Sequence, residues 1–326
     1  MSFIKQILTP EFFQGHLNKK NYFEGWYYKL ISSDRKHSLA IIPGIAAGED
    51  SGSSHSFIQI NDSLSGKTEY LKFSKTDFTA HDKDFCIQIK ENSFTRKSLS
   101  LSLDGKTFTI HGVLNFYDVI PFPKTLFRRS IMGPFGFIPN MECYHGILNI
   151  WQKVSGSLVI NGETVDFEGG TGYIEKDWGI SFPEAWIWLQ ANNFDHEGTS
   201  FMFSIAHIPW IGKSFTGIIA FLYHDGKYHC LATYNRAKIT ECAATDNAID
   251  ISLKNSSYQM KIKSAFPPGG TLIAPMKGKM EREITESISG TIFVTLYHKD
   301  KIIFSGESTN AGVEISGKMD TLFYNH

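Results

Sequence analysis

Residues 98–110 read SLSLSLDGKTFTI, and this stretch decides the fold class. Polar and apolar residues alternate strictly from Ser98 to Leu103, which is the period of a half-buried β-strand. Asp104-Gly105 follows, and this dipeptide favours a two-residue hairpin because a type I′ turn needs a positive φ at both central positions. The stretch therefore predicts an antiparallel hairpin.

The same pattern recurs along the chain. Asn161-Gly162 and Asp225-Gly226 each separate two alternating apolar runs, and Ser65-Gly66 and Lys299-Asp300 are weaker examples. No long amphipathic helical pattern lies between these turn signals. We therefore predict an all-β protein made of antiparallel barrels or sandwiches, and not a parallel α/β fold.

A weak internal repeat indicates two copies of one β unit. Residues 24–30 read EGWYYKL and residues 184–190 read EAWIWLQ, so that Trp26 and Trp186 hold equivalent places 160 positions apart. The length of 326 residues also suits two domains. We predict an N-terminal β domain at 1–181 and a C-terminal β domain at 182–326.

Composition excludes several classes of protein. Lys and Arg total 32 against 33 Asp and Glu, so a generally basic nucleic-acid binder is excluded and only a local basic patch stays open. Aromatic residues make up 14% of the chain, enough to fill a core or to line a large apolar pocket. The four cysteines form no C-x-x-C pair, and the N-terminus shows no apolar signal-peptide core. We expect a cytoplasmic protein with an apolar small-molecule ligand and no metal or cofactor.

The densest chemistry lies in residues 172–190, GYIEKDWGISFPEAWIWLQ. In an extended chain Tyr173, Glu175 and Asp177 share one face, whereas Trp178 lies on the other. A carboxyl beside an apolar wall has a raised pKa and can act as a general acid. The alternative is a solvated charge run with structural tryptophans. The candidate acids are Glu175 and Asp177, with Glu142 and Glu24 in reserve.

Two shorter clusters supply further candidates, residues 142–146 (ECYHG) and 22–29 (YFEGWYYK). A nucleophilic pair of Cys143 and His145 is disfavoured, because sequence neighbours on a strand point apart. The candidate ligand-binding residues are Trp26, Tyr28, Tyr144, His145, Tyr173, Trp178, Trp186, Trp188 and Gln190.

Residues 118–140 break the β pattern with four prolines among large apolar residues that include Phe122, Phe127, Ile131 and Phe135. This composition is unsuited to a central strand and too apolar for a typical exposed loop. It predicts a lid over a pocket, or a patch for peripheral membrane contact in which Arg128 and Arg129 approach lipid phosphates. A loop packed between the domains is an equal alternative.

Residues 23–29, 172–179 and 186–190 resemble signature blocks of the tocopherol cyclase family, and so do residues 272–275 and 308–315. The resemblance implies two lipocalin-like β-barrel modules related to the calycins. It also implies a cyclase that protonates a prenyl double bond, after which a hydroquinone oxygen captures the carbocation without an organic cofactor. Glu175 and Asp177 are the candidate acids for that step.

Three function classes follow. The first is acid-catalysed cyclisation or hydration of a prenylated or lipidic molecule. The second is a non-catalytic lipid or isoprenoid carrier, which a pocket lined only by apolar and neutral groups would favour. The third is a protein–protein adaptor that uses residues 118–140, which a large exposed apolar patch would favour.

Overall fold

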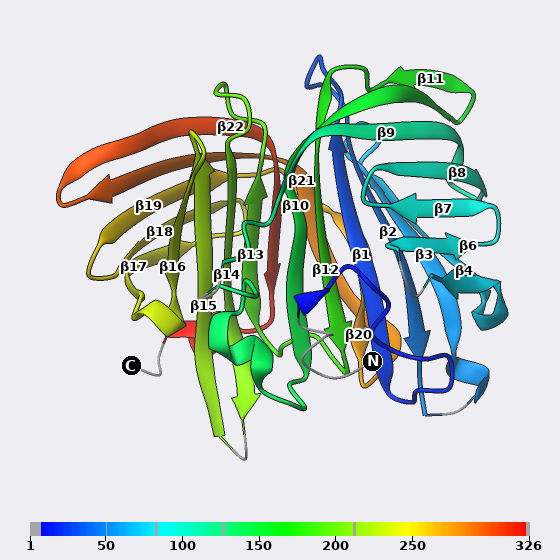
Figure 1. Cartoon of the computed structure of the whole chain (residues 1–326), viewed down its shortest axis with the longest axis horizontal. Helices are drawn as coiled ribbons and strands as arrows, with labels where there is room; N and C mark the ends of the chain where they lie inside the picture. The colour runs from blue at the N-terminus through cyan, green and yellow to red at the C-terminus, as the bar shows by residue number, and fades with distance from the viewer. Residues whose placement is uncertain (1–7, 50, 82–83, 126–127, 211–212, 324–326) are drawn as a thin grey trace. The chain divides into compact units, whose positions relative to one another are not determined.

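The computed structural model describes residues 8–49, 51–81, 84–125, 128–210 and 213–323, and it shows an all-β protein (Figure 1). Its strands form two antiparallel sheets, which confirms the predicted fold class. The short helical elements are η1 (Ser51–Ser53), η2 (Lys75–Asp77), η3 (Gly133–Phe137), η4 (Thr233–Asn235) and α2 (Asp320–Phe323). Within these residues no helix has the length and hydropathy needed to cross a membrane.

The first sheet has the strand order β4-β3-β2-β1-β12-β10-β9-β8-β7-β6-β5, with β11 beside β10. Its strands are β1 (Tyr22–Ile31), β2 (Ser38–Ala47), β3 (His55–Asp62), β4 (Lys67–Ser74), β5 (Phe78–Ala80), β6 (Cys86–Ile89), β7 (Asn92–Thr95), β8 (Ser98–Asp104), β9 (Thr109–Pro121), β10 (Cys143–Ile160), β11 (Glu163–Asp166) and β12 (Gly170–Gly179).

The second sheet has the order β16-β15-β14-β13-β22-β21-β19-β18-β17, with β20 beside β21. Its strands are β13 (Trp186–Ala191), β14 (Ser200–Trp210), β15 (Lys213–His224), β16 (Lys227–Ala232), β17 (Lys238–Ala244), β18 (Ala248–Lys254), β19 (Tyr258–Ala265), β20 (Gly270–Met276), β21 (Lys279–His298) and β22 (Lys301–Ser316).

The two sheets share one topology, which confirms the internal repeat. In each sheet the first strand of the half lies between the second strand and the last: β1 pairs with β2 and β12, and β13 pairs with β14 and β22. The two matching sequence segments, 24–30 and 184–190, fall on β1 and on β13 with the residues just before it. Each therefore occupies the same position in its own sheet.

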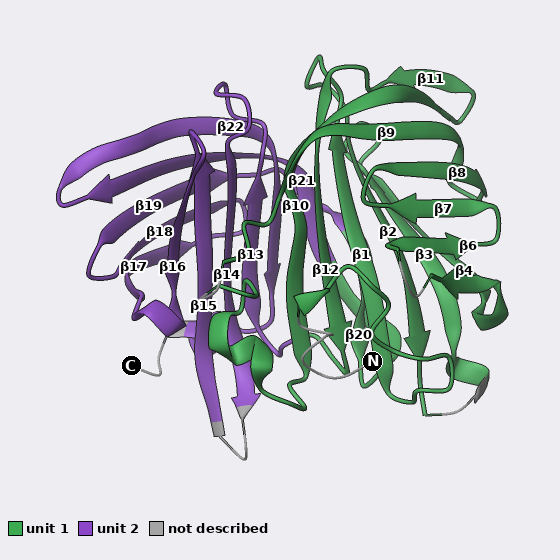
Figure 2. Ribbon diagram, in the orientation of Figure 1, with its two compact units in different colours: residues 1–182, 271–284 green, residues 183–270, 285–326 purple. Residues whose placement is uncertain are grey.

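The chain divides into two compact units (Figure 2). Unit 1 contains residues 1–182 and also residues 271–284, whereas unit 2 contains residues 183–270 and 285–326. The returning hairpin is β20 with the start of β21, and its amides and carbonyls bind unit 1. Gln59 exchanges two hydrogen bonds with the backbone of Ile273, at 2.7 and 3.0 Å. A boundary at 181/182 would assign Ile273 to the C-terminal domain, so that these two hydrogen bonds would run between the two domains.

Of the three strongest turn predictions, two are confirmed by the hairpins of the structure and one is wrong. Asn161-Gly162 has φ values of 52° and 87°, and Asp225-Gly226 has 48° and 71°, so both are two-residue turns as predicted. The type I′ turn predicted at Asp104-Gly105 is wrong, because β8 ends at Asp104 and β9 begins at Thr109. The longer loop forms because the Glu69 carboxylate accepts three successive backbone N–H groups, from Lys106, Thr107 and Phe108.

Each unit has its own apolar core. The strands alternate as expected, so that Ile187 and Leu189 of β13 are fully buried in the core of unit 2. Trp26 and Tyr28 of β1 are likewise fully buried in the core of unit 1, where Tyr28 packs against Phe94. The face of β12 that points away from this core carries Tyr173, Glu175 and Asp177.

Candidate active site

Pairing of β10 with β12 builds a polar cluster on one face of the first sheet. Period-two alternation aligns Tyr173, Glu175 and Asp177 along β12, as predicted. The register then sets His145 of β10 directly opposite Asp177. Four chemically versatile side chains thus come from two adjacent, rigid strands.

His145 joins the two carboxylates. Its Nδ1 lies 2.9 Å from Asp177 Oδ1, and its Nε2 lies 3.5 Å from Glu175 Oε2. The Tyr173 hydroxyl donates a 2.6 Å hydrogen bond to the same Glu175 oxygen. One imidazole therefore connects both candidate acids, and Tyr173 orients the Glu175 carboxylate.

Charge keeps this imidazole protonated. Burial by itself would lower the pKa of His145, but the Asp177 and Glu175 carboxylates outweigh burial and raise that pKa to about 9. The side chains of His145 and Glu175 are only 15% and 6% exposed, so water screens the three charges weakly. At neutral pH the cluster holds an imidazolium between two carboxyl groups.

Cys143 also reaches this cluster, which corrects the reasoning from the sequence. Cys143 and His145 are two positions apart and therefore share a face of β10, and Cys143 Sγ lies 3.8 Å from Asp177 Oδ1. Burial, followed by the nearby Asp177 carboxylate, raises the pKa of the Cys143 thiol well above its usual value. A protonated thiol is a poor nucleophile, so Cys143 serves as a weak donor to Asp177.

The proline-rich segment packs onto β10. Its first residues extend β9 as far as Pro121, which pairs at the end of the strand with Asn149. Ile131 and Met132 are 1% and 7% exposed, and Met132 Sδ lies 3.2 Å from the His145 backbone nitrogen. The segment therefore covers the strand that carries His145. Residues 126 and 127 lie outside the described residues.

The opposite face of β12 carries a second, separate cluster. Lys176 and Glu24 form an ion pair in which both side chains are fully buried. Lys176 also donates to the carbonyls of Pro10 and Phe12 at 2.7 and 2.5 Å, and lies 4.5 Å from the Trp26 ring centre. Burial lowers the pKa of Lys176 to about 8, although Glu24 opposes this. Glu24 thus anchors the N-terminal segment and lies away from His145.

Trp178 belongs to this second face, so the supposed apolar wall beside Glu175 and Asp177 is not formed by it. Its ring stacks on Tyr144 at 5.5 Å, and Tyr144 donates its hydroxyl to the Ile138 carbonyl at 2.7 Å. Glu142 precedes β10, and partial burial raises the pKa of its carboxyl. Tyr144 stands opposite Trp178 in the β10–β12 register, on the face of the sheet away from His145.

The remaining candidates belong to unit 2. Trp186, Trp188 and Gln190 lie on the face of β13 that points away from the core residues. Trp186 Nε1 donates a 2.8 Å hydrogen bond to Glu314 of β22, and Gln190 donates to Asn192 at 3.2 Å. These contacts hold an aromatic, polar-edged face on the second sheet.

His145, Glu175 and Asp177 also have ligand atoms within 4.8 Å of one another, which is close enough to hold a divalent cation. No metal site was expected from the sequence. A cation here would have to displace a proton from an imidazole whose pKa is about 9, so binding would strengthen as the pH rises.

The chain is similar in sequence to a known protein family. A family model described as tocopherol cyclase-like matches residues 121–317. The probable chloroplastic tocopherol cyclase of Oryza sativa subsp. japonica is 23% identical over 203 residues, which cover 58% of this chain and 43% of that protein. The chloroplastic tocopherol cyclase of Zea mays is 33% identical over 67 residues, 21% of this chain and 14% of that protein. The matched region spans less than half the length of these curated relatives.

Three solved structures share the fold. CghA with Sch210972 has a TM-score of 0.57 at 10% identity, over 91% of this chain and 89% of that one. A protein assigned as AttH from Nitrosomonas europaea has 0.54 at 14%, over 90% and 92%. Kievitone hydratase from Nectria haematococca has 0.51 at 11%, over 90% and 89%.

Proposed function

Because the chain belongs to the tocopherol cyclase-like family, we propose that it catalyses acid-promoted addition of an oxygen–hydrogen bond across a carbon–carbon double bond of an apolar small molecule. Addition of the substrate's own hydroxyl closes a ring, and addition of water is a hydration. The observation that carries this proposal is the Asp177–His145–Glu175 chain, in which one imidazole touches two carboxyl groups.

Glu175 is the proton donor in this scheme, and while it carries that proton His145 is held protonated chiefly by the Asp177 carboxylate. Its side chain is the more buried of the two carboxyls, at 6% exposed against 24% for Asp177, and burial disfavours the charged form of a carboxyl. A neighbouring imidazolium makes a carboxylic acid give up its proton more readily. Asp177 accepts the hydrogen bond from His145 Nδ1 and is the proton acceptor in this scheme.

The proton balance closes by exchange with solvent. Glu175 transfers its proton to one alkene carbon and leaves a carbocation on the other. The oxygen of the hydroxyl attacks that cation, a C–O bond forms, and Asp177 accepts the released proton. Exchange with solvent then removes the proton from Asp177 and returns one to Glu175, while His145 keeps a proton on both ring nitrogens, which restores the starting state.

The assay uses a prenyl-hydroquinone in deuterated water. The cyclised product should carry one carbon-bound deuterium, because the transferred proton comes from a group that exchanges with solvent. Glu175→Gln and Asp177→Asn should each lower turnover by 100-fold or more, the usual contribution of general acid–base catalysis being about 10²–10⁴-fold. Glu163→Gln is the matched control, since Glu163 is an exposed carboxylate on β11 of the same sheet.

Binding separates catalysis from the carrier alternative. In the catalytic case Glu175→Gln keeps the affinity for the hydroquinone within a few-fold while turnover disappears. A wild-type protein that binds the hydroquinone without forming deuterated product would support the non-catalytic carrier. Turnover that survives both substitutions would end the assignment of the acid to this cluster.

A further inference from the structure

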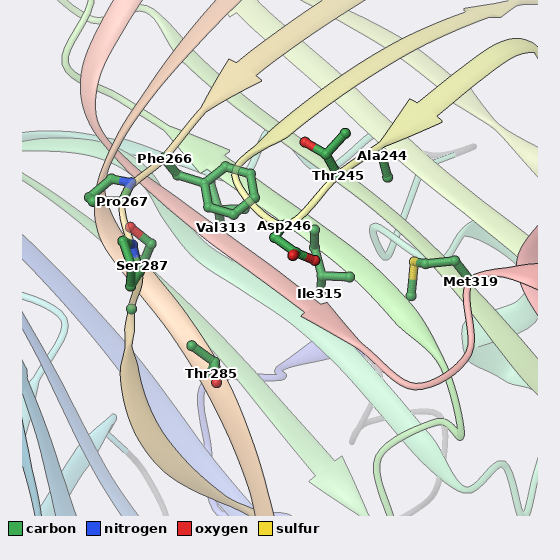
Figure 3. Close-up of a pocket in the computed structure, with 12 residues that line it drawn as sticks. Ala244, Thr245, Asp246, Phe266, Pro267, Thr285, Ser287, Val313, Ile315 and Met319 are labelled. Carbon is green, nitrogen blue, oxygen red and sulfur yellow. The ribbon is translucent and has the colours of Figure 1, made fainter.

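Unit 2 contains a cavity of about 320 Å³ that lies outside the residues of the proposed reaction (Figure 3). Its walls are apolar: Phe266 follows β19, Val313 and Ile315 belong to β22, and Met319 precedes α2. Val313 is part of the buried core of unit 2, and the other three pack against that core. The cavity is thus an open end of the core, of the size that takes a small molecule.

One polar group inside this cavity has no partner among the described residues. Ser287 of β21 is 4% exposed, and its Oγ makes no hydrogen bond with any part of the chain that the structure describes. Ser287 lines the cavity opposite Val313, its partner in the β21–β22 register. A buried hydroxyl without a partner is destabilising, so an incoming donor or acceptor at this point gains a hydrogen bond.

The rim of the cavity carries one charge. Thr245 and Asp246 come from the turn between β17 and β18, and Figure 3 shows Asp246 between Phe266 and Ile315. Asp246 is exposed and is the charged residue among those that line the cavity. Its carboxylate disfavours an anionic ligand head and accepts hydrogen bonds from a neutral hydroxylated one.

We propose that this cavity binds a neutral, hydroxylated apolar molecule, with its hydrocarbon body against Phe266, Ile315 and Met319 and its hydroxyl on Ser287. Asp246 disfavours the binding of a carboxylate whose hydrocarbon chain has the same length as that of the hydroxylated ligand. The site is independent of the Asp177–His145–Glu175 cluster, which belongs to unit 1.

The test compares 1-octanol with octanoate on the full-length chain, with affinity measured by ligand-observed NMR titration. Octanol should bind saturably and more tightly than octanoate. Ser287→Ala should weaken octanol about fivefold, the value of one ordinary hydrogen bond, and leave octanoate within twofold. Ser289→Ala is the matched control, because Ser289 is an exposed serine on the same strand.

A second experiment tests whether Asp246 makes the cavity select against anionic ligands. Asp246→Asn should improve octanoate binding about two- to fivefold and leave octanol unchanged. Ser287→Ala removes only an unpaired hydroxyl, so the unfolding midpoint should stay equal or rise, which shows that the variant is folded. Equal octanol affinity in Ser287→Ala and wild type, tighter binding of octanoate than octanol, or no saturable binding of either probe would each overturn the proposal.

Discussion

The imidazole of His145 is expected to hold its proton until about pH 9, against 6.5 for an ordinary histidine. A rise of this size corresponds to about 3 kcal/mol of folding stability. The figure needs little reduction for solvent screening, because the side chain is 15% exposed. Since the folded-state pKa is raised, this stability is fully present below pH 6.5 and is lost as the pH rises through about 9.

Lys176 changes the folding stability with pH in the opposite direction. Its contribution must therefore be separated from that of His145. Its pKa falls to about 8 from 10.5, so its contribution to stability rises as the pH moves from about 8 to 10.5. The wild-type curve alone therefore mixes two trends. Subtracting the unfolding free energy of His145→Gln from that of wild type at each pH isolates His145.

Two measurements check the prediction. NMR titration of the histidine ring protons, with the His145 signal assigned by its loss in His145→Gln, should give a midpoint near pH 9. Urea unfolding at intervals from pH 6 to 9.5 should show the wild-type advantage over His145→Gln decreasing by about 1.4 kcal/mol per pH unit between pH 6.5 and 9. His111→Gln is the comparison variant, because His111 lies beside Asp104 in an exposed pair at 3.1 Å. A midpoint at or below 6.5, or a difference that is flat with pH, would refute the electrostatic reasoning.

Three further outcomes are expected. Lys176→Met should lower the urea unfolding free energy by about 3–5 kcal/mol, because it leaves Glu24 buried without its ion-pair partner, and the double variant with Glu24→Gln should recover part of that loss. Glu69→Gln should cost about 1–2 kcal/mol and speed hydrogen exchange of the turn amides that Glu69 binds. Gly179→Ala should lower the melting temperature more than Gly162→Ala, since a Cβ at Gly179 would stand 2.1 Å from a backbone carbonyl oxygen, whereas at Gly162 nothing lies within 4 Å.

Local patterns predicted what depends on local physics. Alternation predicted the strands and the shared face of Tyr173, Glu175 and Asp177, since both follow from the two-residue period. The turn at Asn161-Gly162 was predictable for the same reason. The turn at Asp104-Gly105 was not, because Glu69 reorganises it from 35 or more positions away in the sequence.

The partners within the candidate site depend on register, which no local pattern contains. His145 meets Asp177 only because β10 pairs with β12 in one particular alignment. Lys176 was overlooked as a buried cation, although its place between Ile174 and Trp178 on an apolar face was a usable signal. Glu24 is the buried partner of Lys176, and no local pattern links these two residues.

The hairpin at 271–284 sets an order of events during synthesis. Unit 1 is complete only after these residues emerge, roughly 100 residues behind the rest of the unit. At ordinary translation rates that is a delay of about 5–20 s. Throughout that interval Gln59 and Thr68 lack the backbone partners that they bind in the finished protein. The nascent first half therefore lacks part of its own sheet contacts until most of the second half has been synthesised.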